Sequence, residues 1–494
     1  MSTPSMPSDS GAEQGREMGF DSRRAWLAGL GGLAAGAILT RSAQAGPLDP
    51  PVGPVSPTGS TLDQIKQSVA RDGGIAEARR PITQTSGWNI TEPGSYYLTE
   101  NISGAGLVIL ASDVDLDLNG FTVSNDGGFS AITVYSLGLR NVRIRNGTVR
   151  AELVSGGIDG VLLAGVGGTT NSDFVVENLH VSGYGRGQIA GQAGSSVSVN
   201  RLIVRRCSLR AVDAIGSAGV WAGSGAIVED CAISSTGATS RSIGVSAMGG
   251  CVVRRCQFSD LGAGAYLNGQ SLVSECLFTS VGQGISIQAG DSSRIERCGL
   301  FNLRGFGMNL LSRTTVADCT LENVAANAPF GNGIGIQATQ RLRLERTYIS
   351  RAASHGVQVT GFDTVVQDCV FTENAGIGLT CIGPAQIERC HFANNNGAIS
   401  VDQLTRISQC HLDFNGAFGV RATATLGGVD VVDCTITRHT TGVSIAAASG
   451  CAVRRCMFFD NSTAISAPSG NFALYASGAA AANTATNPNI NIGV

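Results

Sequence analysis

Charged and aromatic side chains are both scarce in this sequence. Asp, Glu, Lys and Arg make up 14 % of its 494 residues, against about 25 % in ordinary globular proteins, and aromatic residues make up 5 %. The formal net charge of −3 excludes the basic footprint expected of a nucleic-acid-binding protein. No Cys-x-x-Cys or Cys/His spacing occurs, so the sequence predicts no zinc site, no other metal site and no cofactor.

Glycine and cysteine are abundant instead, with 67 and 14 residues. The glycines follow no G-x-y period, which excludes collagen. A hydrophobic content of 43 % excludes general disorder. Fourteen cysteines in so long a chain are too few for a small disulfide scaffold. The composition therefore indicates a large, weakly charged, globular or repetitive protein.

The N-terminus predicts a cleavable signal peptide over residues 1–45. A pair of arginines, Arg23 and Arg24, precedes an apolar run over 25–40, and small residues stand at the expected cleavage site, Ala43 and Ala45. The run is too short and too weakly apolar for a membrane span, although an uncleaved N-terminal anchor is the alternative. The arginine pair resembles a twin-arginine signal, which implies the twin-arginine export machinery as a partner. We expect a periplasmic, cell-surface or secreted protein.

One short motif, aliphatic-x-x-Cys-x-aliphatic or Phe, recurs at intervals of 20–28 residues, with Thr347 replacing cysteine once. Short alternating segments such as Gly284–Ile287 follow each motif, and turns with positive φ, supplied by glycine or asparagine, are expected between them. This period favours a parallel β-helix over a leucine-rich repeat or a propeller. The eleven cysteines at the repeated position are Cys207, Cys231, Cys256, Cys276, Cys298, Cys319, Cys369, Cys390, Cys410, Cys434 and Cys456.

These repeats, with the opening segments Gly94–Thr99 and Val114–Phe121, resemble the right-handed parallel β-helix repeats of the pectin-lyase-like superfamily. The similarity is to secreted bacterial members without an assigned activity. It implies an all-β, single-stranded right-handed parallel β-helix of about 14–16 coils over residues 90–466. The fold hosts lyases, hydrolases, epimerases and inert fibres, so it implies no single reaction.

The ends of such a solenoid need covers, because its strand edges are open. Residues 46–60 form a proline-rich linker, and 61–89 form an N-terminal cap region whose first part has the spacing of an amphipathic helix. Residues 467–494 are expected to form a C-terminal cap or tail rather than a second domain.

The eleven repeated cysteines are expected to form an internal thiol ladder, with one thiol every ~4.8 Å. Thiols in a parallel stack do not converge for disulfide bonds. A metal-binding stripe is the alternative, but its usual ligand spacing is missing. We therefore expect reduced, buried thiols and hypothesise that they are buried before the protein leaves a reducing compartment.

The residue before each ladder position forms a second regular series, in which the sign of charge alternates. We expect these side chains to face outward at a corner, each between opposite charges, so that they control the stacking register. A sugar-binding rail of mixed charge is the alternative. The series is Arg206, Asp230, Arg255, Glu275, Arg297, Asp318, Arg346, Asp368, Arg389, Gln409, Asp433 and Arg455.

No complete catalytic signature is present. The segment Ser354–Gly356 matches only part of a polygalacturonase-like motif, and no acidic cluster accompanies it. His391 and His411 both follow a ladder cysteine, and Asp413 lies two residues further on, so they form the one weak catalytic candidate. Such a group suits proton transfer or metal binding. An exposed histidine pair without a function is the alternative.

Four asparagines, Asn374, Asn395, Asn415 and Asn461, lie five residues after a ladder position, and we interpret them as left-handed turn residues. Three coils are longer than the rest, over 156–172, 183–199 and 323–332. Long insertions in a repeat protein often carry binding sites. One of these coils contains Tyr184 and Arg186, and another contains Phe330. Aromatic rings in these coils are expected to stack on sugar rings or, alternatively, to pack against the wall of the β-helix.

The sequence thus predicts an exported protein that binds or processes a polysaccharide, with a lyase or hydrolase reaction if it is an enzyme. A non-catalytic surface or structural repeat protein is the alternative. Metal delivery is a third possibility, supported only by the histidine pair. The oligomeric state stays open.

Overall fold

The computed structural model of the protein describes residues 79–467 and 473–476, apart from 86, 105, 126–127, 137, 156–157, 164–170, 194–196, 215, 238–241, 290–291, 312, 328–330, 424–427 and 447–450. All of them belong to one compact unit, Glu77–Val494. The predicted signal peptide, the linker and residues 61–78 of the expected cap lie outside the described residues, as does the tail from 477 onward.

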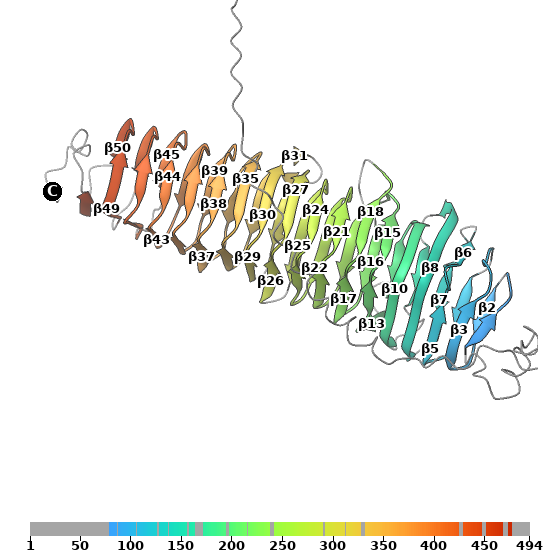
Figure 1. Ribbon diagram of the computed structural model, residues 1–494. Coiled ribbons are helices and arrows are strands. Elements are labelled where there is room, and N and C mark those ends of the chain that lie inside the picture. The colour runs from blue at the N-terminus through green and yellow to red at the C-terminus, as the bar shows by residue number, and fades with distance from the viewer. Residues whose placement is uncertain are drawn as a thin grey trace, which may run out of the picture. The chain divides into compact units, whose positions relative to one another are not determined.

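The unit is an all-β, right-handed parallel solenoid of about 15 turns (Figure 1). A typical turn contains β26 (Ser293–Glu296), β27 (Gly299–Leu303) and β28 (Phe306–Leu310). Strands β26 and β27 belong to a large sheet of 32 strands, which we name sheet A. Strand β28 belongs to the other long sheet, sheet B. Within the described ranges, no helix is long and apolar enough to cross a membrane.

The first strands lie earlier than the expected start at residue 90. Strand β1 (Arg80–Ile82) pairs in parallel with β3 (Gly94–Leu98), and β2 (Trp88–Ile90) pairs with β4 (Leu107–Ile109). Residues 80–89 were expected to belong to the cap. They form solenoid strands because Ile82 and Ile90 are buried in the continuous core.

The core is a column of aliphatic and aromatic side chains held in register between turns. Leu300 of β27 pairs with Leu321, and two phenylalanine pairs stack face to face between turns. The ring centroids of Phe258 and Phe278 are 4.6 Å apart, and those of Phe371 and Phe392 are 4.5 Å apart. In-register stacking repeats each contact along the axis, which explains the short apolar motif in the sequence.

The thiols lie in this core. All fourteen cysteines are free and buried. Each ladder thiol lies near the carbonyl two residues earlier and near one from the previous turn; Cys276 Sγ is 3.2 Å from Ser274 O and 3.7 Å from Val253 O. At Thr347 the hydroxyl takes the same place and donates to Glu345 O over 2.9 Å. Away from the ladder, burial raises the pKa of Cys381 to about 12.

The corner before each ladder position has an unexpected backbone conformation. All twelve residues of the charged series have φ between 44° and 55°, in the left-handed region that non-glycine residues seldom adopt. Their side chains pair between turns: Arg255 Nε donates to Asp230 Oδ1 over 2.7 Å, and Arg389 Nε to Asp368 Oδ1 over 2.8 Å. The register interpretation therefore has a physical basis in these contacts.

Glycine plays a different part from the expected one. The sequence assigned it to left-handed corners, but many glycines instead stack on one another in sheet B. A Cβ added at Gly307 would lie 2.3 Å from Gly335 O and 2.6 Å from Leu321 Cδ2. Neighbouring turns approach too closely there for any side chain, so this column of glycines is a packing requirement.

The asparagine series also corrects the expectation. The left-handed residue is the one before each asparagine, such as Asn394 with φ 55°. Three of the four asparagines, Asn374, Asn395 and Asn415, are buried and bond one another between turns: Asn374 Nδ2 donates to Asn395 Oδ1 over 2.7 Å, and Asn395 Nδ2 donates to Asn415 Oδ1 over 2.8 Å. The series satisfies buried polar groups between turns, as such groups require.

Candidate functional site

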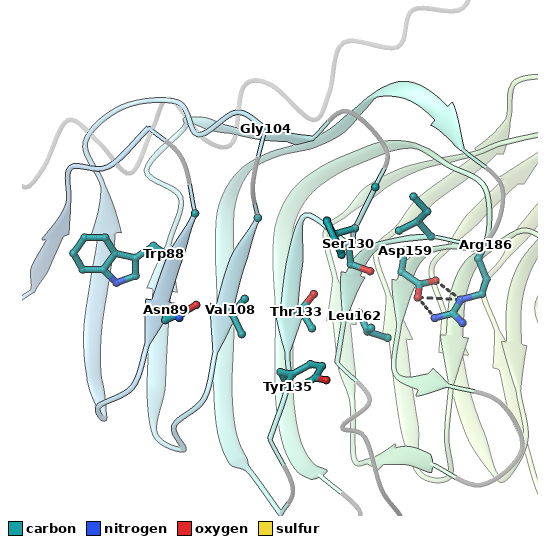
Figure 2. A pocket seen from close by; sticks show the side chains of 15 residues that line it. Trp88, Asn89, Gly104, Val108, Ser130, Thr133, Tyr135, Asp159, Leu162 and Arg186 are labelled. Atoms are coloured by element: carbon teal, nitrogen blue, oxygen red, sulfur yellow. Dashed lines mark hydrogen bonds and ion pairs between the residues drawn. The ribbon is translucent and has the colours of Figure 1, made fainter.

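A groove of about 850 Å³ lies on the outer face of sheet B at the N-terminal end of the described solenoid (Figure 2). Four successive strands of sheet B contribute to it, β2, β4, β7 (Ile132–Val134) and β9 (Asp159–Leu162), and Arg186 stands just before the next strand, β11 (Gly187–Ala190). The described lining residues are Gly87, Trp88, Asn89, Gly104, Gly106, Val108, Gly128, Phe129, Ser130, Thr133, Tyr135, Ile158, Asp159, Leu162 and Arg186.

The floor of the groove is one row of side chains, one from each turn. Asn89 pairs with Val108, Val108 with Thr133, and Thr133 with Leu162. Figure 2 shows these four side chains side by side. They face outward because successive residues of a strand point to opposite faces, and their neighbours Ile90 and Ile109 fill the core. The row is therefore straight and spaced by the strand separation of about 4.8 Å.

Aromatic side chains stand along this row. Phe129 is 79 % exposed and Tyr135 is 58 % exposed, while Trp88 is half-buried against the core. Ser130 and Thr133 add hydroxyl groups beside them, and Asn89 adds an amide. The groove therefore combines apolar faces of aromatic rings with neutral hydrogen-bonding groups that lie between the rings.

An ion pair closes one end of the groove. Arg186 Nε donates to Asp159 Oδ1 over 2.9 Å and to Oδ2 over 3.0 Å, and Arg186 Nη2 also binds Oδ2. Asp159 has no exposed surface, whereas the Arg186 side chain is 39 % exposed. A Cβ at Gly187 would lie 2.9 Å from Asp159 Oδ1, so the absence of a side chain there makes room for the carboxylate.

Burial raises the pKa of Asp159, and the hydrogen bond from Arg186 opposes that shift. The hydrogen bond to Asp159 in turn raises the pKa of Arg186. The Asp159 carboxylate binds the Nε and Nη2 atoms of the Arg186 guanidinium. The other N–H groups of Arg186 stay available to a ligand in the groove. Asp159 thus fixes the position of Arg186 and cancels its charge.

The chemistry available in the groove is hydrogen bonding and ring stacking. Hydrolysis of a glycoside by inversion uses two carboxyl groups separated by about 6.5–9.5 Å. Asp159 is the one carboxyl group among the described lining residues. The described lining residues therefore do not include the carboxyl pair that such hydrolysis uses.

His391 and His411, the candidates from the sequence, lie far along the chain from this groove. They pair in register on β41 (His391–Ala393) and β44 (His411–Asp413), with ring centroids 5.1 Å apart. Burial and the neighbouring His411 lower the pKa of His391. Asp413 is engaged by other groups, since Arg438 Nε donates to Oδ1 over 2.9 Å and Thr437 Oγ1 donates to the same atom over 2.6 Å. No group of three or more metal-ligating side chains occurs within the described ranges.

Comparison with known proteins agrees with the solenoid geometry. The family model of the right handed beta helix region matches residues 193–336 and 263–403. The chain is a right-handed parallel β-helix repeat protein. No curated protein sequence matches it.

Several solved structures are similar to this β-helix protein. The mannuronan C-5 epimerase AlgE4 A-module of Azotobacter vinelandii is 12 % identical, with a TM-score of 0.31; the match covers 77 % of this chain and 90 % of that one. The Dettilon tailspike protein is 11 % identical, with coverage of 76 % and 65 % and a TM-score of 0.25. The surface protein and adhesin PfbA of Streptococcus pneumoniae is 8 % identical, with coverage of 83 % and 95 % and a TM-score of 0.17.

Two further histidines of the β-helix protein, His355 and His439, have structural contacts. His355 Nδ1 accepts a hydrogen bond from Ile377 N over 3.0 Å, and burial lowers its pKa. His439 is buried, continues the asparagine series through Asn415 N at 3.0 Å, and has a pKa lowered by burial. Neither of these two histidines lines the groove.

Sequence reasoning found part of the groove through the lengths of the coils. Two of the three long coils contain Asp159 and Arg186. Tyr184, expected to be free for sugar stacking, is instead 1 % exposed and packs in the core at the end of β10 (Asn171–Tyr184). Phe330 lies outside the described residues. Trp88 and Tyr135 were missed, because no local motif connects residues that only the stacking of turns brings together.

Proposed function

We propose that this β-helix protein binds a polysaccharide in the groove between Trp88 and Arg186. The observation that carries the proposal is the set of aromatic, hydroxyl and amide groups that β2 and the turn around β7 present along one groove. The faces of sugar rings carry C–H groups that pack on aromatic rings, while their hydroxyl groups need hydrogen-bonding partners at the edges. The groove offers both kinds of contact in one line.

Binding without cleavage is the form of the proposal that the groove supports best. Its one described carboxyl group is buried and bonded to Arg186, so it is not placed to attack or to protonate a glycosidic bond in the manner of a paired-carboxylate enzyme. The protein would then hold a glycan as an adhesive or structural component.

The proposal includes export of the protein. The arginine pair Arg23–Arg24 and the Ala43–Ala45 site support it, since folded proteins with such signals cross the cytoplasmic membrane whole. Mass measurement of the protein recovered from outside the cytoplasm is expected to give an N-terminus at Gly46. Replacing both arginines by lysine is expected to leave an uncleaved precursor inside the cell; unchanged export of that variant would contradict the proposal.

Polysaccharide binding is tested by affinity electrophoresis of the full chain through gels that contain neutral or acidic polysaccharides. Retardation is expected in at least one gel, and Trp88→Ala and Tyr135→Ala should each reduce it at least fivefold. Phe362→Ala is the matched control, because Phe362 is 64 % exposed but lies outside the groove. Equal retardation of all three variants, or none in any gel, would overturn the proposal.

A further inference from the structure

The charge of the groove limits the class of glycan that it accepts. Asp159 and Arg186 are the only formally charged residues among its described lining residues, and they neutralise each other. A polymer with a carboxylate on every sugar would lose hydration on entering and find no net positive charge among the described lining residues in return. A neutral polymer avoids that loss and still finds hydrogen-bond donors and acceptors.

Arg186 contributes as a donor rather than as a free cation. Two of its nitrogens bind Asp159, so the exposed part of the guanidinium presents N–H groups in a fixed direction. A guanidinium has five N–H donors in one plane. Fixing that plane beforehand reduces the entropy lost when a ligand hydroxyl binds.

The spacing of the floor sets the length of ligand that is recognised. Asn89, Val108, Thr133 and Leu162 follow one another in register, and Arg186 stands before the next strand of the sheet, β11. One turn advances about 4.8 Å, and a sugar in an extended β-linked chain advances by roughly 5 Å, so the two periods nearly match. Over this length, one sugar unit meets one turn of the solenoid.

We propose that the groove selects an uncharged, extended glycan that lies along the solenoid axis and contacts about four of its sugar units. This inference rests on the proposed binding function and adds the charge, the direction and the length of the ligand. Asp159 acts as the specificity-determining residue, because its buried carboxylate balances the charge of Arg186, the one cation among the described lining residues.

The test is a calorimetric titration of the full chain with oligosaccharides of two to six units. The neutral probes are β-1,4-linked glucose and mannose oligomers, and the acidic probe is the galacturonate series. Affinity for a neutral series is expected to rise up to about four or five units and then level off. Tetragalacturonate is expected to bind at least tenfold more weakly.

The Asp159→Asn variant gives the more specific test of the inference about charge. It keeps the size of the side chain and leaves the Arg186 charge without its counter-charge, so the preference for neutral over acidic tetramers should fall at least fivefold. The thermal midpoint of the variant checks its fold, and Asp363→Asn is the control at an exposed aspartate outside the groove.

The outcomes separate the inference from the proposed function. If acidic oligomers bind as tightly as neutral ones and Trp88→Ala weakens them, the groove binds polysaccharide and the inference about charge is wrong. If the affinity levels off at two units, the inference about length is wrong. If no oligomer and no polymer binds, the proposed function itself fails.

Discussion

Arg346 and Asp318 stand on neighbouring turns, both in the left-handed conformation, and form two hydrogen bonds, of 2.7 Å and 3.0 Å. Their φ angles are 44° and 55°. At such a pair of corners the charged series therefore does two things: it bends the chain, and it ties one bend to the bend of a neighbouring turn. These two roles are separable by substitution.

Substitutions of Asp318 separate the backbone from the charge. Asp318→Asn removes the charge but tolerates a positive φ, so we expect a small decrease in thermal midpoint. Asp318→Val places a β-branched residue in the left-handed region, where strain costs about 1–3 kcal/mol. Thermal unfolding followed by circular dichroism should show a clearly larger decrease for valine; equal decreases for both variants would show that only the charge matters.

The corner ion pairs make stability depend on pH. Hydrogen bonds from Arg255, Arg346 and Arg389 hold the pKa values of Asp230, Asp318 and Asp368 below their usual range. Because these values are lower in the folded than in the unfolded chain, the stabilisation is present above about pH 4 and is lost as the pH falls through the folded values.

We therefore expect the thermal midpoint to decline below about pH 4, and to decline slightly less in Asp368→Asn, because each of these solvent-exposed pairs contributes little by itself. High salt at neutral pH should lower the midpoint as well, since it screens exposed pairs. A midpoint that is flat between pH 5 and pH 2.5 would contradict this account of the corners.

The glycine column of sheet B is expected to tolerate no side chain. Gly307→Ala should destabilise the protein strongly, because its Cβ would lie 2.3 Å from Gly335 O, and overpacking costs about 1–3 kcal/mol or more. Gly128→Ala is the matched control, since a Cβ there meets nothing within 4 Å. Urea denaturation of both variants measures the difference, and a Gly307→Ala protein as stable as the control would refute the packing role.

The thiols are expected to be protected by burial rather than by pairing. Titration with a chromogenic disulfide reagent should find almost no reactive thiol in the native protein and all fourteen after denaturation, because every cysteine is free and buried. Burial raises the pKa of Cys251 to about 12, which adds to the protection. Markedly fewer than fourteen thiols in denatured, unreduced protein would reveal disulfide bonds that the solenoid geometry does not provide.

The sequence predicted the solenoid well because its period is local. Each ladder cysteine and the charged residue before it recur together. Aligning the repeats therefore predicts both that Cys319 faces the core and that Asp318 faces outward. The left-handed conformation of those charged residues was not predictable by the same reasoning, since arginine and glutamate have no intrinsic preference for it. Contacts with the turns on either side impose it.

The groove was predictable only in part. Coil length pointed to the segments that hold Asp159 and Arg186, but not to their contact, which depends on the stacking of two turns. Trp88 lies in a strand that the sequence assigned to a cap, and Tyr135 belongs to a different turn. A sequence pattern that repeats once per turn predicts the regular wall of a solenoid. A binding site forms where side chains on that wall differ from the repeated pattern, so the pattern does not predict it.

Filling the groove with a large side chain is the most direct test of the claim that the groove binds a polysaccharide. Gly128 lines the groove with open space around its missing side chain, and Gly416 lies outside the groove, where an added Cβ would make only ordinary van der Waals contacts with Asn396, the nearest at 3.5 Å. Gly128→Phe and Gly416→Phe should both fold with nearly unchanged thermal midpoints. The account predicts that Gly128→Phe weakens polysaccharide binding at least tenfold while Gly416→Phe binds as the parent does. Binding by the folded Gly128→Phe protein at the parent's affinity would contradict the claim that this groove holds the glycan.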